Sequence, residues 1–189
     1  VGSQPLGGEG RSGTGPTAGG PGYLGRFTRG EGGVGGAFAR AADPAQVQLA
    51  LSRLHVPQAA LSTEDLQGPT GESNRLTSHA RGPILCLGPG PEAVVAQAAA
   101  VRAVGGVALE VSGALEPAAL TTLQGFAAAV WWGDPASTQA LQLALAARPG
   151  PILPLIHEMP DSSWVRIERH VCIDTTASGG NAQLLAASG

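Results

Sequence analysis

The chain has 189 residues, which is enough for one domain with appendages, and 29 of them are glycine and 15 are proline. Only 13% are charged and the net charge is −3, so no basic footprint for nucleic acid or for an acidic membrane is present. The hydrophobic content of 43% suffices for a core, but no apolar run is long enough to cross a bilayer, and we expect a cytoplasmic protein.

Glycine dominates residues 1–40, where no periodicity persists beyond a few positions. Asp43 and Pro44 then have the pattern of an N-cap followed by proline at the first helical position, and the apolar spacing predicts a helix over 44–54. Residues 68–74, GPTGESN, are turn-forming and are expected to lead to the first strand.

The centre of the chain, residues 81–111, has the pattern of a strand–helix–strand unit. Apolar runs at 83–87 and 107–111 flank an alanine-rich segment, 92–104, whose apolar residues recur at helical spacing. The expected buried face of this helix consists of Val94, Val95, Ala98 and Val101. Such a crossover makes the two strands parallel neighbours, and a parallel sheet needs helices on both faces.

The sequence after this unit continues the same alternation of helices and strands. The expected elements are a short helix at 117–123, a strand at 126–132, a helix at 135–148 that Asp134 caps, and a strand at 151–156. The predicted fold class is therefore α/β, with a Rossmann-like parallel sheet of about four strands and flanking helices. Trp131 and Trp132 are expected to divide between the two faces of this sheet.

Residues 163–174 alternate between apolar and polar, which predicts a long, half-exposed strand. Its length and mixed polar face are typical of a hairpin arm or an edge strand that pairs outside the parallel sheet. Cys86 and Cys172 both lie in predicted strands and are expected to be buried free thiols. The loop at 157–163 carries Glu158 and Asp161, but the spacing is too sparse for a metal site, and we expect none.

Several strings in the chain resemble a known family. Residues 4–27, QPLGGEGRSGTGPTAGGPGYLGRF, resemble the end of the catalytic domain of aldehyde dehydrogenases that oxidise glutamate semialdehyde, as found in the proline utilization A family. Members of this family fuse proline dehydrogenase to glutamate-semialdehyde dehydrogenase. Leu6 replaces the family's usual phenylalanine, and Thr17 stands where lysine is common. The resemblance implies that Pro5, Leu6, Gly7 and Gly8 neighbour the loop that anchors the substrate carboxylate.

Further strings match the long members of this family. GPTGESN at 68–74 and RGPILCLGP at 81–89 resemble the opening of their second, catalytically silent aldehyde-dehydrogenase-like domain. Residues 168–189, ERHVCIDTTASGGNAQLLAASG, resemble their terminal motif. The resemblance implies that this motif packs against the catalytic domain and helps to cover an internal tunnel. The docking residues implied are Glu168, Arg169, Asp174, Thr175, Thr176, Gly179, Gly180 and Asn181.

The same resemblance implies that the central unit is related to the part of an aldehyde dehydrogenase that holds NAD. The asparagine of the family's first loop and the lysine after its second strand are absent here, and the turn GPGPEA is not a G-x-G-x-x-G motif. We expect this chain to bind no cofactor, with NAD and FAD bound elsewhere in the parent. If a nucleotide does bind, the crevice that would hold it includes Gly88, Gly90, Glu110 and Asp134.

The chain is thus interpreted as a C-terminal fragment of such a bifunctional enzyme, inactive alone, whose partner is the parent's catalytic aldehyde dehydrogenase domain. The expected organisation is a catalytic-domain tail at 1–27, a linker at 28–42, a Rossmann-like domain at 43–162, and a long strand with a docking tail at 163–189. Two alternatives remain open. One is a small module that binds a nucleotide or an acyl group, and the other is an element that makes a homo-oligomer by pairing of the 163–174 strand.

Overall fold

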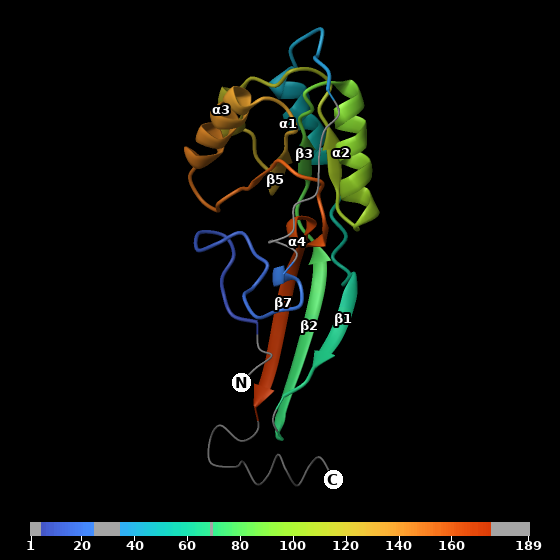
Figure 1. Cartoon of the computed structure of the whole chain (residues 1–189), viewed down its shortest axis with the longest axis vertical. Helices are drawn as coiled ribbons and strands as arrows, with labels where there is room; N and C mark the ends of the chain where they lie inside the picture. Colours follow the sequence, from blue (N-terminus) through green and yellow to red (C-terminus); the bar gives the residue numbers. More distant parts are fainter. Residues whose placement is uncertain (1–4, 25–34, 69, 175–189) are drawn as a thin grey trace.

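A computed structural model of the chain describes residues 5–24, 35–68 and 70–174. Two sheets are arranged end to end (Figure 1). The four-stranded sheet and its helices occupy one end of the molecule, and a three-stranded sheet projects from the other end. We call this projecting sheet the arm.

The four-stranded sheet is parallel, as the sequence predicts. It consists of β3 (Ile84–Cys86), β4 (Ala108–Glu110), β5 (Ala128–Val130) and β6 (Leu155–Ile156), in the order β4-β3-β5-β6. The chain connects β3 to β4 on one side and then passes to β5 on the other side, so the crevice between β3 and β5 is a topological switch point. The strands are shorter than the apolar runs that predict them. The remaining apolar residues of these runs, such as Leu87, lie in the adjoining loops and are also buried.

The helices α1 (Pro44–Arg53), α2 (Pro91–Ala103) and α3 (Pro135–Ala146) and the 3-10 helix η2 (Pro117–Thr121) all begin with proline. Asp43 caps α1 by accepting a hydrogen bond from the Ala45 backbone N–H at 2.9 Å. Asp134 caps α3 in the same way through the Ser137 N–H at 2.9 Å. These caps confirm the helix starts expected from the sequence.

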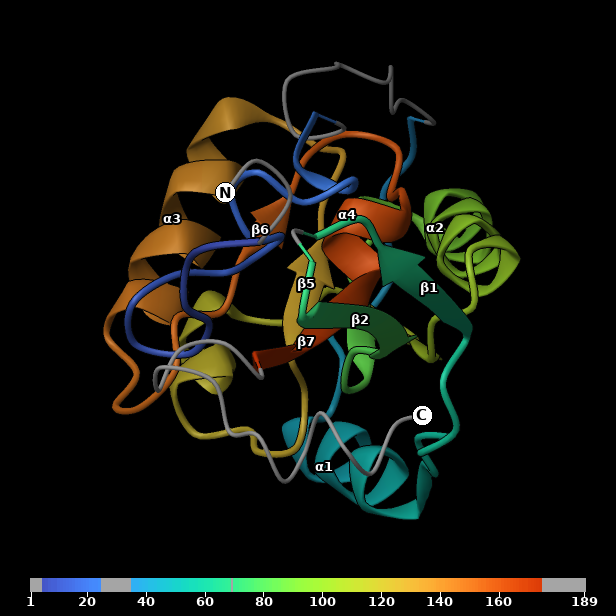
Figure 2. The same cartoon turned by 90° about the horizontal axis from the view of Figure 1, so that it is seen from below.

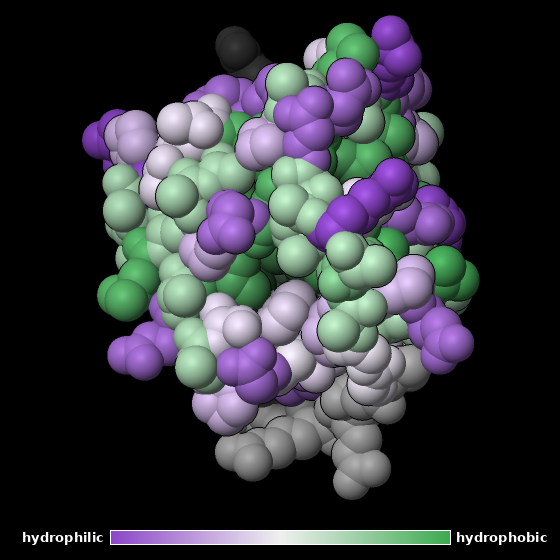
Figure 3. Space-filling view, turned by 90° about the horizontal axis from the view of Figure 1, so that it is seen from above, coloured by the Kyte–Doolittle hydropathy of each residue, from purple (hydrophilic) through white to green (hydrophobic). Residues whose placement is uncertain are grey.

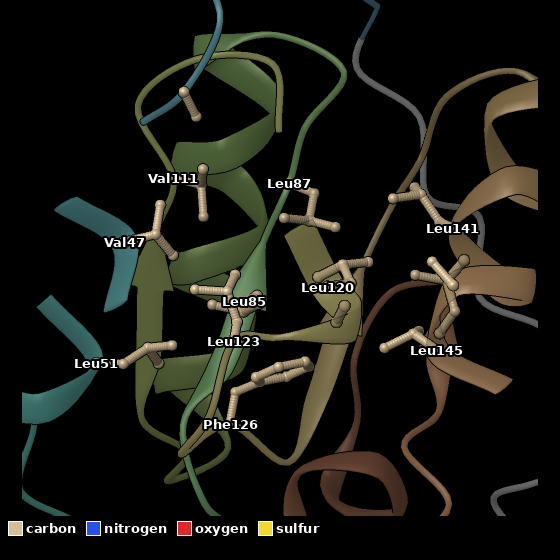
Figure 4. Close-up of a cluster of buried hydrophobic side chains, with 14 residues drawn as sticks. Val47, Leu51, Leu85, Leu87, Val111, Leu120, Leu123, Phe126, Leu141 and Leu145 are labelled. Atoms are coloured by element: carbon tan, nitrogen blue, oxygen red, sulfur yellow. The ribbon is translucent and has the colours of Figure 1, made fainter. Parts of the chain in front are cut away.

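Each face of the parallel sheet buries a separate hydrophobic cluster. One cluster lies between the sheet and α1, η2 and α3, where side chains such as Leu85 and Leu120 are fully buried (Figure 4). The other lies beneath α2 and includes Ile84 and Val101. A fully buried leucine contributes about 1.5–3 kcal/mol, so the two clusters account for most of the stabilisation of this end. Trp131 packs on the first cluster and Trp132 on the second, as expected.

The buried face of α2 differs from the expected one. Val94, Ala98 and Val101 are buried, but 57% of Val95 is exposed. The centre of the face lies instead along Ala93 and Gln97, which are both fully buried. The prediction for Val95 was wrong because four apolar residues at helical spacing fit more than one face when most of their neighbours are alanine.

The arm contains two strands that the sequence pattern missed. β1 (Ser62–Leu66) and β2 (Glu72–Ala80) pair antiparallel, and β2 pairs antiparallel with β7 (Arg166–Asp174). The order β1-β2-β7 makes β7 an edge strand outside the parallel sheet, as expected. The expected turn is present at residues 70–71 but is shorter than the string 68–74, because β2 already begins at Glu72. The long strand starts later than expected, since a single helical turn, α4 (Ser162–Val165), precedes it.

Residues 36–42 cross the carboxyl ends of the parallel strands, and we call this segment the strap. The Ala42 N–H donates to the Ala114 carbonyl at 2.8 Å, and the Ala114 N–H donates to the Arg40 carbonyl at 2.9 Å. Phe38 packs against the cluster beneath α2. The expected linker at 28–42 therefore ends in a segment that is packed on the domain, and its residues 28–34 lie outside the described part of the chain.

Candidate functional site

The N-terminal segment, residues 5–24, folds back on itself and lies against the base of the arm (Figure 2). Its two halves are held together by the Leu6 N–H, which donates to the Ala18 carbonyl at 2.8 Å. Its middle is attached near β6, where the Ile152 N–H donates to the Gly10 carbonyl at 2.7 Å. The segment that the sequence assigns to the tail of a catalytic domain is thus bound to the rest of the chain.

Glu168 of β7 forms the most direct contact between this segment and the arm. Its Oε2 accepts hydrogen bonds from the Thr17 backbone N–H at 3.1 Å and from the Thr17 hydroxyl at 2.6 Å. The carboxylate approaches so closely that a Cβ added to Gly22 would lie 2.7 Å from Oε1. Hydrogen bonds to an ionised carboxylate are among the stronger ones, so Glu168 fixes the position of Thr17 relative to the arm.

Arg81 joins three parts of the chain at the same place. Its side chain is only 8% exposed, and Nη2 donates to the Thr14 carbonyl at 2.7 Å and to the Arg166 carbonyl at 3.2 Å. The Glu9 carboxylate lies 3.4 Å from the same nitrogen. Burial lowers the pKa of Arg81, but a guanidinium remains charged at neutral pH. We call the set Glu9, Thr14, Thr17, Arg81 and Glu168 the junction.

Glu9 is the second carboxylate of the junction, and its pKa depends on its surroundings there. Its pKa is raised, first by burial and also by the nearby Glu168 carboxylate, while Arg81 acts in the opposite direction. A raised pKa means that the ionised form is less favourable in the folded protein than in water. The contribution of Glu9 to stability is therefore present at acidic pH and decreases as the pH rises through the raised pKa.

The other residues expected to dock lie around the junction or beyond the described residues. Pro5 is buried in the N-terminal segment, while Leu6, Gly7 and Gly8 are exposed beside it. Arg169 is exposed on β7, and Asp174 ends that strand opposite Glu72. The remaining predicted docking residues lie outside the described part of the chain: Thr175, Thr176, Gly179, Gly180 and Asn181.

Several polar groups of the expected nucleotide crevice have partners within the chain itself. The buried amide of Gln97 accepts from the Gly88 N–H at 3.1 Å and donates to the Gly88 carbonyl at 2.8 Å. A Cβ on Gly88 would lie 2.9 Å from the Phe38 ring, so the strap covers this loop. Glu110 pairs with Arg102 at 2.7 Å, and Asp134 caps α3. Three of the four predicted crevice residues, Gly88, Glu110 and Asp134, thus have partners. The fourth, Gly90, precedes α2 and lies against the backbone of the strap. The absence of a cofactor stays a prediction.

The two cysteines differ in burial and therefore in expected reactivity. Cys86 is fully buried, and burial raises the pKa of its thiol to about 12. Cys172 is exposed, so the expectation that both thiols are buried was wrong for it. Partial desolvation and the Glu72 carboxylate also raise the pKa of the Cys172 thiol. Neither cysteine has the depressed pKa that a nucleophilic thiol requires.

A thiol-labelling experiment checks this difference. We expect an aromatic disulfide reagent at pH 8 to modify Cys172 in the native chain and Cys86 only after unfolding, because the thiolate is the reactive species. The C172S variant should show no labelling before denaturant is added. Rapid labelling of Cys86 in the folded variant would contradict its burial.

In residues 5–24, 35–68 and 70–174, no group of three or more histidine, cysteine or acidic side chains is placed to hold a metal ion. Among the helices of the same ranges, none has the length and apolar character needed to cross a membrane. The cytoplasmic location stays a prediction.

Three residues with structural roles, Arg81, Thr17 and Gln97, were not recognised from the sequence. In the sequence, Arg81 is only the first residue of the string 81–89, Thr17 is a departure from the family's lysine, and Gln97 lies within the alanine-rich segment 92–104. A polar residue inside an otherwise apolar helix face is the signal that could have identified Gln97. The contact between Thr17 and Glu168 joins residues 151 positions apart, and no local pattern predicts such a pair.

The fold and the junction define a Rossmann-like α/β domain that carries an antiparallel arm and binds its own glycine-rich N-terminal segment. No family model matches the chain. Among curated proteins, Bifunctional protein PutA of Rhizobium meliloti is 33% identical over 227 residues, covering 98% of this chain and 18% of that protein. Bifunctional protein PutA of Escherichia coli K12 is 34% identical over 235 residues, with the same coverage.

The chain therefore belongs to the PutA family and spans 18% of the length of the curated relatives that it matches. Solved structures of proline utilization A are also similar to part of it. A Bradyrhizobium japonicum mutant shares 24% identity with a TM-score of 0.41, covering 59% of this chain and 14% of that one. A proline utilization A structure with proline bound in remote sites has a TM-score of 0.40 at the same identity and coverage.

Proposed function

We propose that this chain is a structural part of a bifunctional enzyme that oxidises proline to glutamate. In this proposal the parent binds FAD and NAD outside the chain, and the chain supports the NAD-dependent oxidation of glutamate semialdehyde. It does so by holding the tail of the catalytic domain and by covering the tunnel through which the intermediate passes. The partner of the arm is thus the aldehyde dehydrogenase domain of the same parent.

The observation that carries the proposal is the pair of hydrogen bonds from Thr17 to the Glu168 carboxylate. Thr17 belongs to the string that resembles a catalytic-domain tail, and Glu168 belongs to the string that resembles the family's terminal motif. The neighbour of Thr17, Ala18, is hydrogen-bonded to Leu6 of the predicted substrate-loop neighbourhood. A short covalent and hydrogen-bonded path leads from Glu168 to Leu6, and in this proposal Leu6 neighbours the aldehyde site.

Such a path matters for catalysis because reacting groups must be held within a fraction of an ångström of their productive geometry. A loop anchored at one end only would sample many orientations and would admit water to the site. Glu168 is in this view a positioning residue, which acts on the substrate loop through Thr17 and Ala18. Arg81 supports the same geometry through its hydrogen bond to the Thr14 carbonyl.

The test uses the full-length parent, in which both activities can be measured on one polypeptide. We expect Glu168→Leu to lower kcat for NADH formation from glutamate semialdehyde by about tenfold, since a charge-assisted pair is lost. Glu168→Gln keeps an acceptor oxygen and should recover part of this loss. Deleting Asp174–Gly189 should reduce the same activity while proline oxidation continues.

The matched control is Glu64→Leu, which replaces an exposed glutamate on the opposite edge strand of the arm. It should leave both activities unchanged. Proline dehydrogenase activity in every variant reports whether the parent is folded. Equal loss of both activities in Glu168→Leu would indicate general unfolding, and full aldehyde oxidation in that variant would refute the positioning role.

A further inference from the structure

A cavity of about 440 Å³ lies at the carboxyl end of β4, between the strap and the first turns of α2. Its wall is formed chiefly by Phe38 and Arg40 of the strap, Val94 and Val95 of α2, and Glu110 and Ser112 after β4. Seen from this end of the molecule, apolar side chains gather around a hollow (Figure 3). Cavities of roughly 300–1,000 Å³ are typical of small-molecule sites.

The apolar part of the wall includes a side chain that the fold leaves uncovered. Val95 is 57% exposed although its neighbour Val94 is buried in the core. The Phe38 ring is partly buried against the same cluster and presents another apolar surface to the cavity. A ligand with an aliphatic or aromatic body would remove this surface from water, which is favourable in proportion to the area buried.

The polar part of the wall carries one uncompensated positive charge. In the parts of the chain that the structure describes, the guanidinium of Arg40 and the hydroxyl of Ser112 have no hydrogen-bond or ion-pair partner. Glu110 is neutralised by Arg102, whose Nη1 lies 2.7 Å from its Oε1. Glu92 lies in the first turn of α2, but it is not part of the wall. The remaining charge at the rim is therefore that of Arg40.

We propose that this cavity binds a small carboxylate with an apolar body, such as a medium-chain fatty acid or an aryl carboxylate. The body lies on Phe38, Val94 and Val95, and the carboxylate pairs with the Arg40 guanidinium and the Ser112 hydroxyl. Arginine suits this role because its planar fork of N–H donors matches a carboxylate. The cavity shares no residue with the junction, so this inference is independent of the proposed docking function.

The experiment is a calorimetric titration of the 189-residue chain with decanoate, decanol and decylamine. We expect saturable binding of decanoate that is about tenfold tighter than that of decanol, because only the carboxylate gains a charge-assisted pair. Decylamine should bind more weakly than decanol, since its charge has the sign of Arg40. Arg40→Gln should weaken decanoate binding by about the same tenfold factor and leave decanol unchanged.

Two exposed apolar positions provide a matched pair of charged substitutions. Val95→Asp places a negative charge in the wall of the cavity and should abolish decanoate binding. Leu143→Asp makes the same change on α3, at a side chain that is 64% exposed, and should leave binding intact. Circular dichroism confirms that each variant is folded. Equal affinity for decanoate and decylamine, no saturable binding of decanoate, or undiminished binding in folded Val95→Asp would overturn the proposal.

Discussion

Replacing Arg81 with methionine is expected to lower the free energy of unfolding by about 3 kcal/mol, because the substitution removes a buried charged donor and its hydrogen bonds. The side chain is only 8% exposed, and its loss deprives the Thr14 and Arg166 carbonyls of a donor. The Glu9 carboxylate also loses its nearest positive charge. Methionine keeps much of the side-chain volume, so the effect measures the polar contacts rather than a cavity.

The measurement is urea unfolding at neutral pH, followed by circular dichroism. Arg75→Met is the matched control, since Arg75 also pairs with a carboxylate, that of Asp65 at 2.9 Å, but is exposed on the arm. Exposed pairs of this kind contribute little to stability, and we expect no measurable change there. If both substitutions had the same small effect, the guanidinium of Arg81 would have to be hydrated in solution.

The second large effect is expected at Gly113, where the strap meets the loop after β4. Its φ of +123° is one that residues with a side chain rarely adopt, and a Cβ would lie 2.8 Å from the backbone of Ala41 and Ala42. Gly113→Ala should therefore cost about 3 kcal/mol or more, from strain and from overpacking together. The alternative to this cost is displacement of the strap, which would break its two hydrogen bonds with Ala114.

Gly125→Ala separates strain from crowding. Gly125 also has a positive φ, of +82°, but no atom lies within 4 Å of its Cβ position. We expect a loss of only about 1–2 kcal/mol at this position, from backbone strain alone. Thermal unfolding of both variants gives the comparison, and faster hydrogen exchange at the Ala42 and Ala114 amides in Gly113→Ala would report displacement of the strap. Equal losses in the two variants would mean that the strap does not pack closely on Gly113.

The parallel sheet could be predicted from the sequence because each of its strands is an apolar run bounded by turn residues. The run at 83–87 and the alanine-rich helix after it are local signals, and the fully buried Ile84 and Leu85 confirm them. The caps at Asp43 and Asp134 were predicted for the same reason, since a cap and its helix are neighbours in the sequence.

The arm could be predicted only in part. β7 alternates clearly, whereas β2, ESNRLTSHA, contains polar residues on both faces and a single large apolar residue, Leu76. What makes β2 a strand is pairing on both sides, with β1 and with β7. β1 is exposed at four of its five positions, so it has no hydrophobic pattern either. Strand preference depends strongly on such context.

The junction could be predicted only as a set of strings, not as a contact. The resemblance to the family identified both the segment that contains Thr17 and the strand that contains Glu168. Their contact joins residues that are 151 positions apart in the sequence.

The strap could not be predicted for a related reason. Its glycine-rich sequence is typical of a linker, and Phe38 is the one bulky residue that indicates packing.

The position of the parallel sheet within the chain also determines the order in which the protein can fold. β2 and β7 are the paired strands of the arm, yet the whole parallel sheet lies between them in the sequence. Arg81 and Arg166, which contact each other across the base of the arm, are 85 positions apart. Closing so long a loop before anything else forms is entropically costly. Once the parallel sheet is folded, it brings the end of β2 close to the start of β7. We therefore expect these two strands to pair last during folding and to separate first when the core is weakened.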